Sequence, residues 1–150
     1  MQNNNVKAKK FQEFLVANQI TCFGEQTMED DIQTVIFRTN LEVGGQQLPV
    51  MLVTDDSLHT LLQVRVVPVL QDAGSHSVLA YINELNRTYK SFKYFLSEDK
   101  ALILDVCLTG APEQFEPQLV SLNLDIILRH LTAEYPVIMR KIWAETAPSQ

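Results

Sequence analysis

The sequence predicts an α+β fold in which a mostly antiparallel sheet packs against helices. Three observations lead to it. Residues 32–43 alternate between apolar and polar side chains, as a half-buried strand does. A Gly-Gly pair suited to a hairpin turn follows directly. Residues 7–20 and 116–144 instead repeat their apolar positions every three or four residues, which is typical of helices. The expected order is helix, strands, helix, two strands, long helix.

Length and composition predict one domain over residues 1–150, with residues 1–6 and 145–150 as flexible tails. The chain has 12 basic and 18 acidic residues, a net charge of −6. That balance argues against a nucleic-acid partner, because neutralising phosphates dominates such binding. The longest apolar stretch, Val64–Leu70, is interrupted and too short for a bilayer, which argues against a membrane partner. With no apolar leader near the lysines, we expect a cytoplasmic location.

The first predicted helix covers Lys7–Ile20, and Thr21–Gln26 has the character of a short strand. Ile32–Val43 predicts the next strand. Gly44 and Gly45 tolerate the positive φ angles of a two-residue turn, so Gln46–Thr54 is expected to return beside it. Pro49 lacks an N–H group, which suggests a sheet edge or a bulge. The apolar face of the first predicted helix consists of Ala8, Phe11, Phe14 and Leu15.

A strand over Leu58–Val69 and a linker lead to a second helix, for which Ser75 or Ser77 is the expected N-cap. Two further strands follow, over Tyr89–Leu96 and Ala101–Thr109. The apolar positions of the second predicted helix are Val78, Ile82 and Leu85. Those on one face of the last strand are Leu102, Leu104, Val106 and Leu108.

The most helical segment, about Glu116–Ala144, carries two apolar stripes and therefore needs two packing partners. The sheet is the first partner, and the first helix or a second protein chain is the other. Pro136 predicts a kink or a restart near Tyr135. The broad stripe consists of Val120, Leu124, Ile127, Leu131, Tyr135, Ile138 and Ile142, and the second of Leu119, Leu122, Ile126, Ala133 and Val137. The expected interface residues are Leu122, Ile126, Val137 and Trp143.

Two groups of residues could carry chemistry. Asp55, Asp56 and His59 could serve a metal or a hydrolase, but aspartates in a hairpin turn more often bond to the local backbone. Asp72 with His76 could form a carboxylate–imidazole pair, but the ordinary interpretation is a helix start. Because no second ligand cluster supports the first group and no nucleophile motif accompanies the second, we expect no catalytic residues, no metal and no cofactor, and hence no enzyme.

Several other residues admit a functional and a structural interpretation. Basic and aromatic residues alternate around Tyr89–Leu96, which could bind RNA but also suits a strand that covers a core. His130 is expected at the surface or an interface, and Asp105 on a partly exposed face. Cys22 and Cys107 are far apart in sequence and are expected to be small buried hydrophobic residues.

Residues 78–136 contain four short motifs: residues 81–86 (YINELN), residues 92–96, Leu102-Ile103-Leu104-Asp105 and Tyr135-Pro136. These motifs resemble the YbjN-like family, described as bacterial sensory-transduction regulators with a fold similar to type III secretion chaperones. The element order also resembles the chaperone fold. The resemblance implies a small, acidic, non-enzymatic protein that forms a homodimer, and it brings no catalytic residues. Asn83 and Asn86 match an element of the family whose role is structural.

We therefore expect a protein-interaction module, chaperone-like or regulator-like, that acts as a homodimer and binds a polypeptide through apolar surface. The alternative is a small-molecule sensor with a pocket between the sheet and the long helix. Tyr81, Tyr94 and Tyr135 would supply the polar groups of that pocket.

Overall fold

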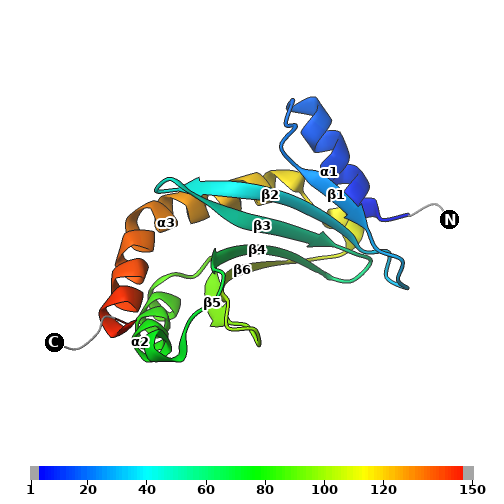
Figure 1. The fold of residues 1–150 in the computed structure, drawn as a ribbon. Coiled ribbons are helices and arrows are strands. Elements are labelled where there is room, and N and C mark those ends of the chain that lie inside the picture. Colours follow the sequence, from blue (N-terminus) through cyan, green and yellow to red (C-terminus); the bar gives the residue numbers. More distant parts are fainter. Residues whose placement is uncertain (1–3, 147–150) are drawn as a thin grey trace.

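The computed structural model describes residues 4–146, without the side chains of residues 72–75, 145 and 146. It contains one six-stranded antiparallel sheet in the order β1-β2-β3-β4-β6-β5 and three α-helices, which confirms the α+β prediction (Figure 1). The helices are α1 (Val6–Ala17), α2 (Asp72–Thr88) and α3 (Pro117–Thr146), with a 3-10 turn η1 (Pro112–Gln114). The strands are β1 (Gly24–Thr27), β2 (Val35–Val43), β3 (Gln46–Thr54), β4 (His59–Val67), β5 (Lys93–Leu96) and β6 (Leu102–Thr109).

The predicted hairpin forms with the predicted bounds for its second strand. Gly44 and Gly45 have φ angles of 55° and 81°, and Val43 pairs with Gln46 across the turn. Pro49 lies in a strand that is interior to the sheet, but at this position β3 is paired on one side only, as the predicted edge requires. It pairs with Asn40 in an interior strand, but β4 pairs with β3 only from Val50 onward. Pro49 therefore lies beyond the end of the β3–β4 ladder, where a missing donor removes no ladder bond.

Helix α1 begins earlier than the predicted tail allows. Asn5 is buried and accepts a hydrogen bond from the Ala8 N–H at 2.8 Å, which caps the helix. The Asn5 side chain also donates to the Thr54 carbonyl at 3.0 Å. These bonds hold the start of α1 against the end of β3, so Asn5 and Val6 belong to the fold. Residues 1–3 and 147–150 of the predicted tails lie outside the described residues.

One face of the sheet forms the core with the helices. The ring of Phe11 in α1 lies edge-on to Phe37 of β2 at 4.8 Å between centroids. Val78, Ile82 and Leu85 of α2 are buried, as predicted. Helix α2 starts at Asp72, ahead of both serines expected to cap it, and its N-cap residue Gln71 makes no side-chain capping bond. The core strands contribute alternate residues, among them Phe37, Leu52, Leu62, Val64, Leu102, Leu104 and Val106.

Helix α3 is one continuous helix that contains Pro136. Figure 1 shows it running behind the sheet and then bending, so that its C-terminal part lies beside α2. A proline removes one backbone hydrogen bond and crowds the preceding turn, which accounts for a bend without a break. Four residues of the predicted broad stripe are fully buried: Val120, Ile127, Leu131 and Ile138.

Both cysteines are exposed, so the prediction that they are buried was wrong. Cys107 lies on β6 between the buried Val106 and the half-buried Leu108, on the face that points away from the helices. Cys22 precedes the short edge strand β1, all of whose residues are exposed. Their exposure follows from strand alternation and from an edge position, respectively.

Candidate interaction surface

The second apolar stripe of α3 remains partly uncovered. Leu122 is 53% exposed and Leu119 38% exposed, and Ala133 is also exposed. Ile126 and Val137 are half-buried. We call these five residues the outer stripe. It stays uncovered because α3 turns its broad stripe to the core and because α1 contacts α3 near η1 rather than along its length. Large exposed apolar side chains in a row are typical of a binding surface.

Of the four predicted interface residues, Leu122 and Trp143 are strongly exposed. Trp143, the sole tryptophan of the chain, is 67% exposed. Ile126 packs partly against the core cluster and Val137 is half-buried, so each offers less free area. Leu122 and Ile126 therefore lie together on the part of α3 that precedes Pro136, whereas Trp143 lies on the part that follows it.

The polar residues beside the outer stripe carry opposite charges. Asp125 and Arg129 are both exposed, are four residues apart and lie on either side of Ile126 along the helix. A polypeptide partner could match both the apolar stripe and this pair of charges.

The sheet supplies a second surface, which the sequence reasoning did not identify. Its outer side chains alternate with the core residues and no helix covers them; we call this the open face. Arg38, Pro49 and Cys107 are exposed there, and Met51 and Leu61 are half-buried. The alternation of the strands was the available signal, but only the positions of all three helices show that this face is bare. The face includes Ile36, Arg38, Asn40, Pro49, Met51, Val53, Leu61, Gln63, Arg65, Lys93, Phe95, Ile103, Asp105 and Cys107.

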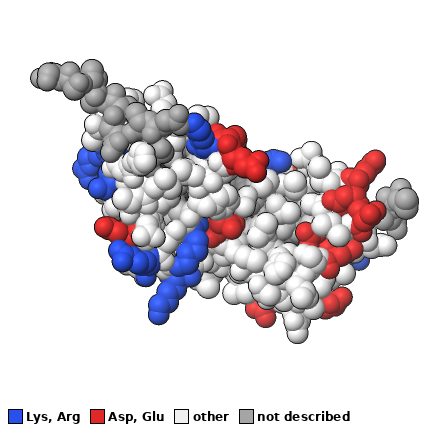
Figure 2. All heavy atoms as spheres, turned by 90° about the horizontal axis from the view of Figure 1, so that it is seen from below, with Lys and Arg blue, Asp and Glu red and all other residues white. Residues whose placement is uncertain are grey.

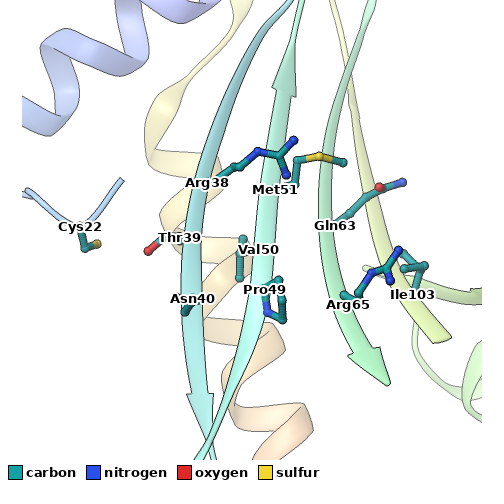
Figure 3. Close-up of a pocket in the computed structure, with 10 residues that line it drawn as sticks. All are labelled: Cys22, Arg38, Thr39, Asn40, Pro49, Val50, Met51, Gln63, Arg65 and Ile103. Atoms are coloured by element: carbon teal, nitrogen blue, oxygen red, sulfur yellow. The ribbon is translucent and has the colours of Figure 1, made fainter. Parts of the chain in front are cut away.

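A hollow of about 410 Å³ lies on the open face. Figure 3 shows Arg38, Met51 and Gln63 side by side on neighbouring strands, with Cys22 beyond β2 and with α3 on the other side of the sheet. Arg65 at its border is tied to Asp99 at 3.2 Å. The hollow thus combines two arginines with both polar and apolar residues, among them Gln63 and Met51.

Charge is unevenly distributed over the face of the molecule that Figure 2 shows. In Figure 2 most Lys and Arg side chains gather toward the end at which α2 lies, and most Asp and Glu side chains toward the opposite end. The surface between them in that view is largely uncharged. An uncharged middle between two charged ends suits a macromolecular contact better than a site for a small ion.

The candidate acids at residues 55 and 56 do not converge on His59. Asp55 accepts hydrogen bonds from the backbone and the hydroxyl of Ser57, at 2.9 and 2.5 Å, which is the local turn expected for aspartate. Asp56 accepts from the Gln33 amide at 3.2 Å instead. His59 Nδ1 lies 3.7 Å from the thiol of Cys107. The three side chains therefore serve three different contacts.

Asp55 has a structural partner that sequence reasoning missed. Lys7 is almost fully buried, and its ammonium donates to the carbonyls of Ser57 and His59 at 2.8 and 2.9 Å. Asp55 lies 3.9 Å from the same ammonium. Burial lowers the pKa of Lys7, and the Asp55 charge acts in the opposite direction. Lys7 thereby fixes α1 to the β3–β4 turn, a contact between segments fifty residues apart.

His130 is buried, so its expected surface position was wrong. Its Nε2 lies 2.6 Å from the Tyr94 hydroxyl, and its ring packs against Tyr89 and Phe92 with centroids 4.5 and 4.4 Å apart. The same contacts bury Phe92 and Tyr94, which confirms that β5 covers a core. Burial raises the pKa of Tyr94.

The tyrosines proposed for a sensor pocket make different contacts in the structure. Tyr94 is bonded to His130, and the Tyr81 hydroxyl donates to Glu134. Both polar groups are thus engaged within the chain, while Tyr135 is half-buried. The small-molecule sensor therefore stays a prediction.

The side chain of Asp72 lies outside the described residues, so the predicted pairing of Asp72 with His76 stays a prediction.

No cluster of three or more His, Cys, Asp or Glu side chains converges as metal ligands would within the described part of the chain. None of the described helices is both long and apolar enough to cross a bilayer. Comparison with known proteins finds no matching family model, no matching curated protein and no matching solved structure.

Proposed function

We propose that this chain is a non-enzymatic interaction module, chaperone-like or regulator-like, that acts as a homodimer in the cytoplasm and binds a second polypeptide through α3. The outer stripe of α3 is the observation that carries this proposal. Leu122 exposes more than half of its surface beside the half-buried Ile126. Burying such side chains on binding stabilises a complex by roughly 25 cal/mol for each Å² of apolar area removed from water.

The element order supports the same class of function. A helix, strands, a helix, two strands and a long helix follow one another, and this order resembles the type III secretion chaperone fold. A fold alone does not determine function. The proposal therefore depends on the outer stripe and on the charges of Asp125 and Arg129 beside it.

The homodimer is tested by the molar mass in solution. Size-exclusion chromatography with light scattering at high micromolar concentration is expected to give twice the 17.1 kDa of the chain. A mass equal to one chain at that concentration would reject the homodimer.

Polypeptide binding is tested with the insulin B chain, which aggregates when insulin is reduced and exposes apolar segments. We expect the protein to delay this aggregation and Leu122→Glu to shorten the delay at least twofold. Ser121→Glu places the same charge on the neighbouring exposed position and is expected to act like the unaltered protein. Equal delays for the two variants, or no delay with the unaltered protein, would contradict binding through α3.

A further inference from the structure

The open face contains a line of residues that is complementary to itself. Arg38, Met51, Gln63 and Asp105 are successive cross-strand partners on β2, β3, β4 and β6. Neighbouring strands are about 4.8 Å apart, so the two charged ends of this line are separated by roughly 14 Å. A cation lies at one end and a carboxylate at the other, with two uncharged residues between them.

Neither charge forms an ion pair within the described part of the chain. Arg38 donates to the Gln26 side chain at 3.4 Å and forms no ion pair there. Asp105 is half-buried, and its Oδ1 is shielded from water without a hydrogen-bond partner. Burial raises the pKa of Asp105, and a hydrogen bond from Gln63 opposes that effect.

The basic residue nearest to Asp105 in the sheet directs its ammonium group to other partners. Lys93 is its cross-strand partner on β5, but the Lys93 ammonium turns away and donates to the carbonyls of Asn86 and Tyr89 at 2.6 and 2.7 Å. A carboxylate in such surroundings is stabilised by a cation that approaches from outside the chain.

In a two-fold symmetric dimer, the second copy of the chain provides that cation. A two-fold axis parallel to the strands, passing above the line between β3 and β4, would place β2 of one copy over β6 of the other. Arg38 of each copy then faces Asp105 of the other. The same operation places Val53 over Leu61 and so joins the apolar centres of the two faces. Sheets packed face to face in this aligned manner are common.

We propose that two copies of this chain pair through their open faces, with Arg38 of each copy on Asp105 of the other. The inference rests on the homodimer proposed above and assigns the surface that forms it. Phe95, which is 40% exposed on β5, then falls beyond β2 of the other copy, beside the hollow that Cys22 and Pro49 line. The outer stripe of α3 lies on the other side of the sheet and remains available for the polypeptide.

The first test exchanges the two charges. By sedimentation equilibrium, Arg38→Glu is expected to raise the dimer dissociation constant about 100-fold or more, and Arg38→Glu with Asp105→Arg to restore it to within about tenfold. Arg140→Glu makes the same charge change at an exposed position of α3 and is expected to leave it unchanged. Circular dichroism shows whether each variant is folded. An unchanged dissociation constant for folded Arg38→Glu would overturn the proposal.

A second test does not require a charge at position 105. Ile36 of one copy is expected to lie over Cys107 of the other, whereas within one chain the two are three strands apart, roughly 14 Å. In a Cys22→Ser background, Ile36→Cys is therefore expected to give a covalent dimer with a bismaleimide whose arm is about 8 Å, shorter than that separation. The same protein with Cys107→Ser is the control. Equal yields from the two proteins would count against the open-face pair.

These outcomes separate the two proposals. A monomeric unaltered protein rejects the homodimer and the open-face pair together. A dimer that Leu122→Glu dissociates and Arg38→Glu does not would retain the homodimer and reject the open face as its interface.

Discussion

The imidazole of His130 and the phenol of Tyr94 form a buried pair, with 2.6 Å between Nε2 and the hydroxyl oxygen. The pair joins α3 to the edge strand β5. The second imidazole nitrogen, Nδ1, is buried without a hydrogen-bond partner among the described residues. A protonated imidazole needs two acceptors, so these surroundings favour the neutral ring.

The first prediction concerns pH. Burial lowers the pKa of His130 below its usual value, and Glu134 opposes this. Tyr94 and Tyr89 also face the ring. Because the folded state then binds fewer protons than the unfolded state, the stabilising contribution is present above about pH 6.5 and is lost as the pH falls through and below that value. We expect the free energy of unfolding in urea to fall between pH 7.5 and pH 5. His130→Gln should reduce this fall, and an equally steep fall in that variant would refute the assignment.

Removal of the Tyr94 hydroxyl should destabilise the fold. Tyr94→Phe keeps the ring that packs on Phe92 but leaves Nε2 of His130 without its partner. A buried polar group left unpaired costs about 1–3 kcal/mol, which urea unfolding at pH 7.5 measures. Tyr89→Phe is the control, because it retains the edge-on contact with the same imidazole and is itself at the surface. Equal losses in both variants would show that the Tyr94–His130 bond contributes nothing specific.

Lys7 should contribute more to the free energy of unfolding than an ordinary surface lysine does. Lys7→Met retains most of the buried volume but removes the ammonium that satisfies the carbonyls of Ser57 and His59. The expected loss is about 1–3 kcal/mol in the free energy of unfolding. Lys9→Met, at an exposed position of the same helix, should change it by less than about 0.5 kcal/mol. A loss no larger than that of Lys9→Met would mean that the Lys7 contacts do not hold α1 in place.

The turn between β2 and β3 offers a test of backbone strain. Gly45 has a φ angle of 81°, so Gly45→Ala forces an L-residue into the left-handed region at a cost of about 1–2 kcal/mol. Gly24→Ala introduces the same methyl group in β1, where the nearest atom lies 4.0 Å from the new carbon. Thermal unfolding should therefore start at a lower temperature for Gly45→Ala than for Gly24→Ala. The reverse order would contradict the strain argument.

Local patterns predicted the elements well where neighbouring residues decide them. The hairpin follows from Gly44 and Gly45, which need no distant contact to adopt their turn. The buried stripe of α3, with Ile127 and Leu131 at its centre, follows from helical spacing alone. Segment ends were less accurate: α2 begins at Asp72, two residues after the buried Leu70, and not after either serine that was expected to cap it.

The errors concern residues whose surroundings come from distant parts of the chain. Seen on a helical wheel, His130 belongs to a polar seam, yet an edge strand thirty-six residues away covers it. Cys107 was expected inside because a thiol is a small apolar group, yet it lies on the face of β6 that no helix reaches. Neither outcome can be obtained from spacing, because each depends on which face another element occupies.

The sequence by itself determined the fold class, the hairpin and the two-sided character of α3, because periodicity and turn chemistry act over a few neighbouring residues. Only the tertiary structure decided that all three helices contribute to one core and leave the other face of the sheet bare. It also placed Arg38 and Asp105 at the two ends of one line across four strands. Strand order and helix placement arise from contacts between distant segments, and these together create the surfaces to which we assign function.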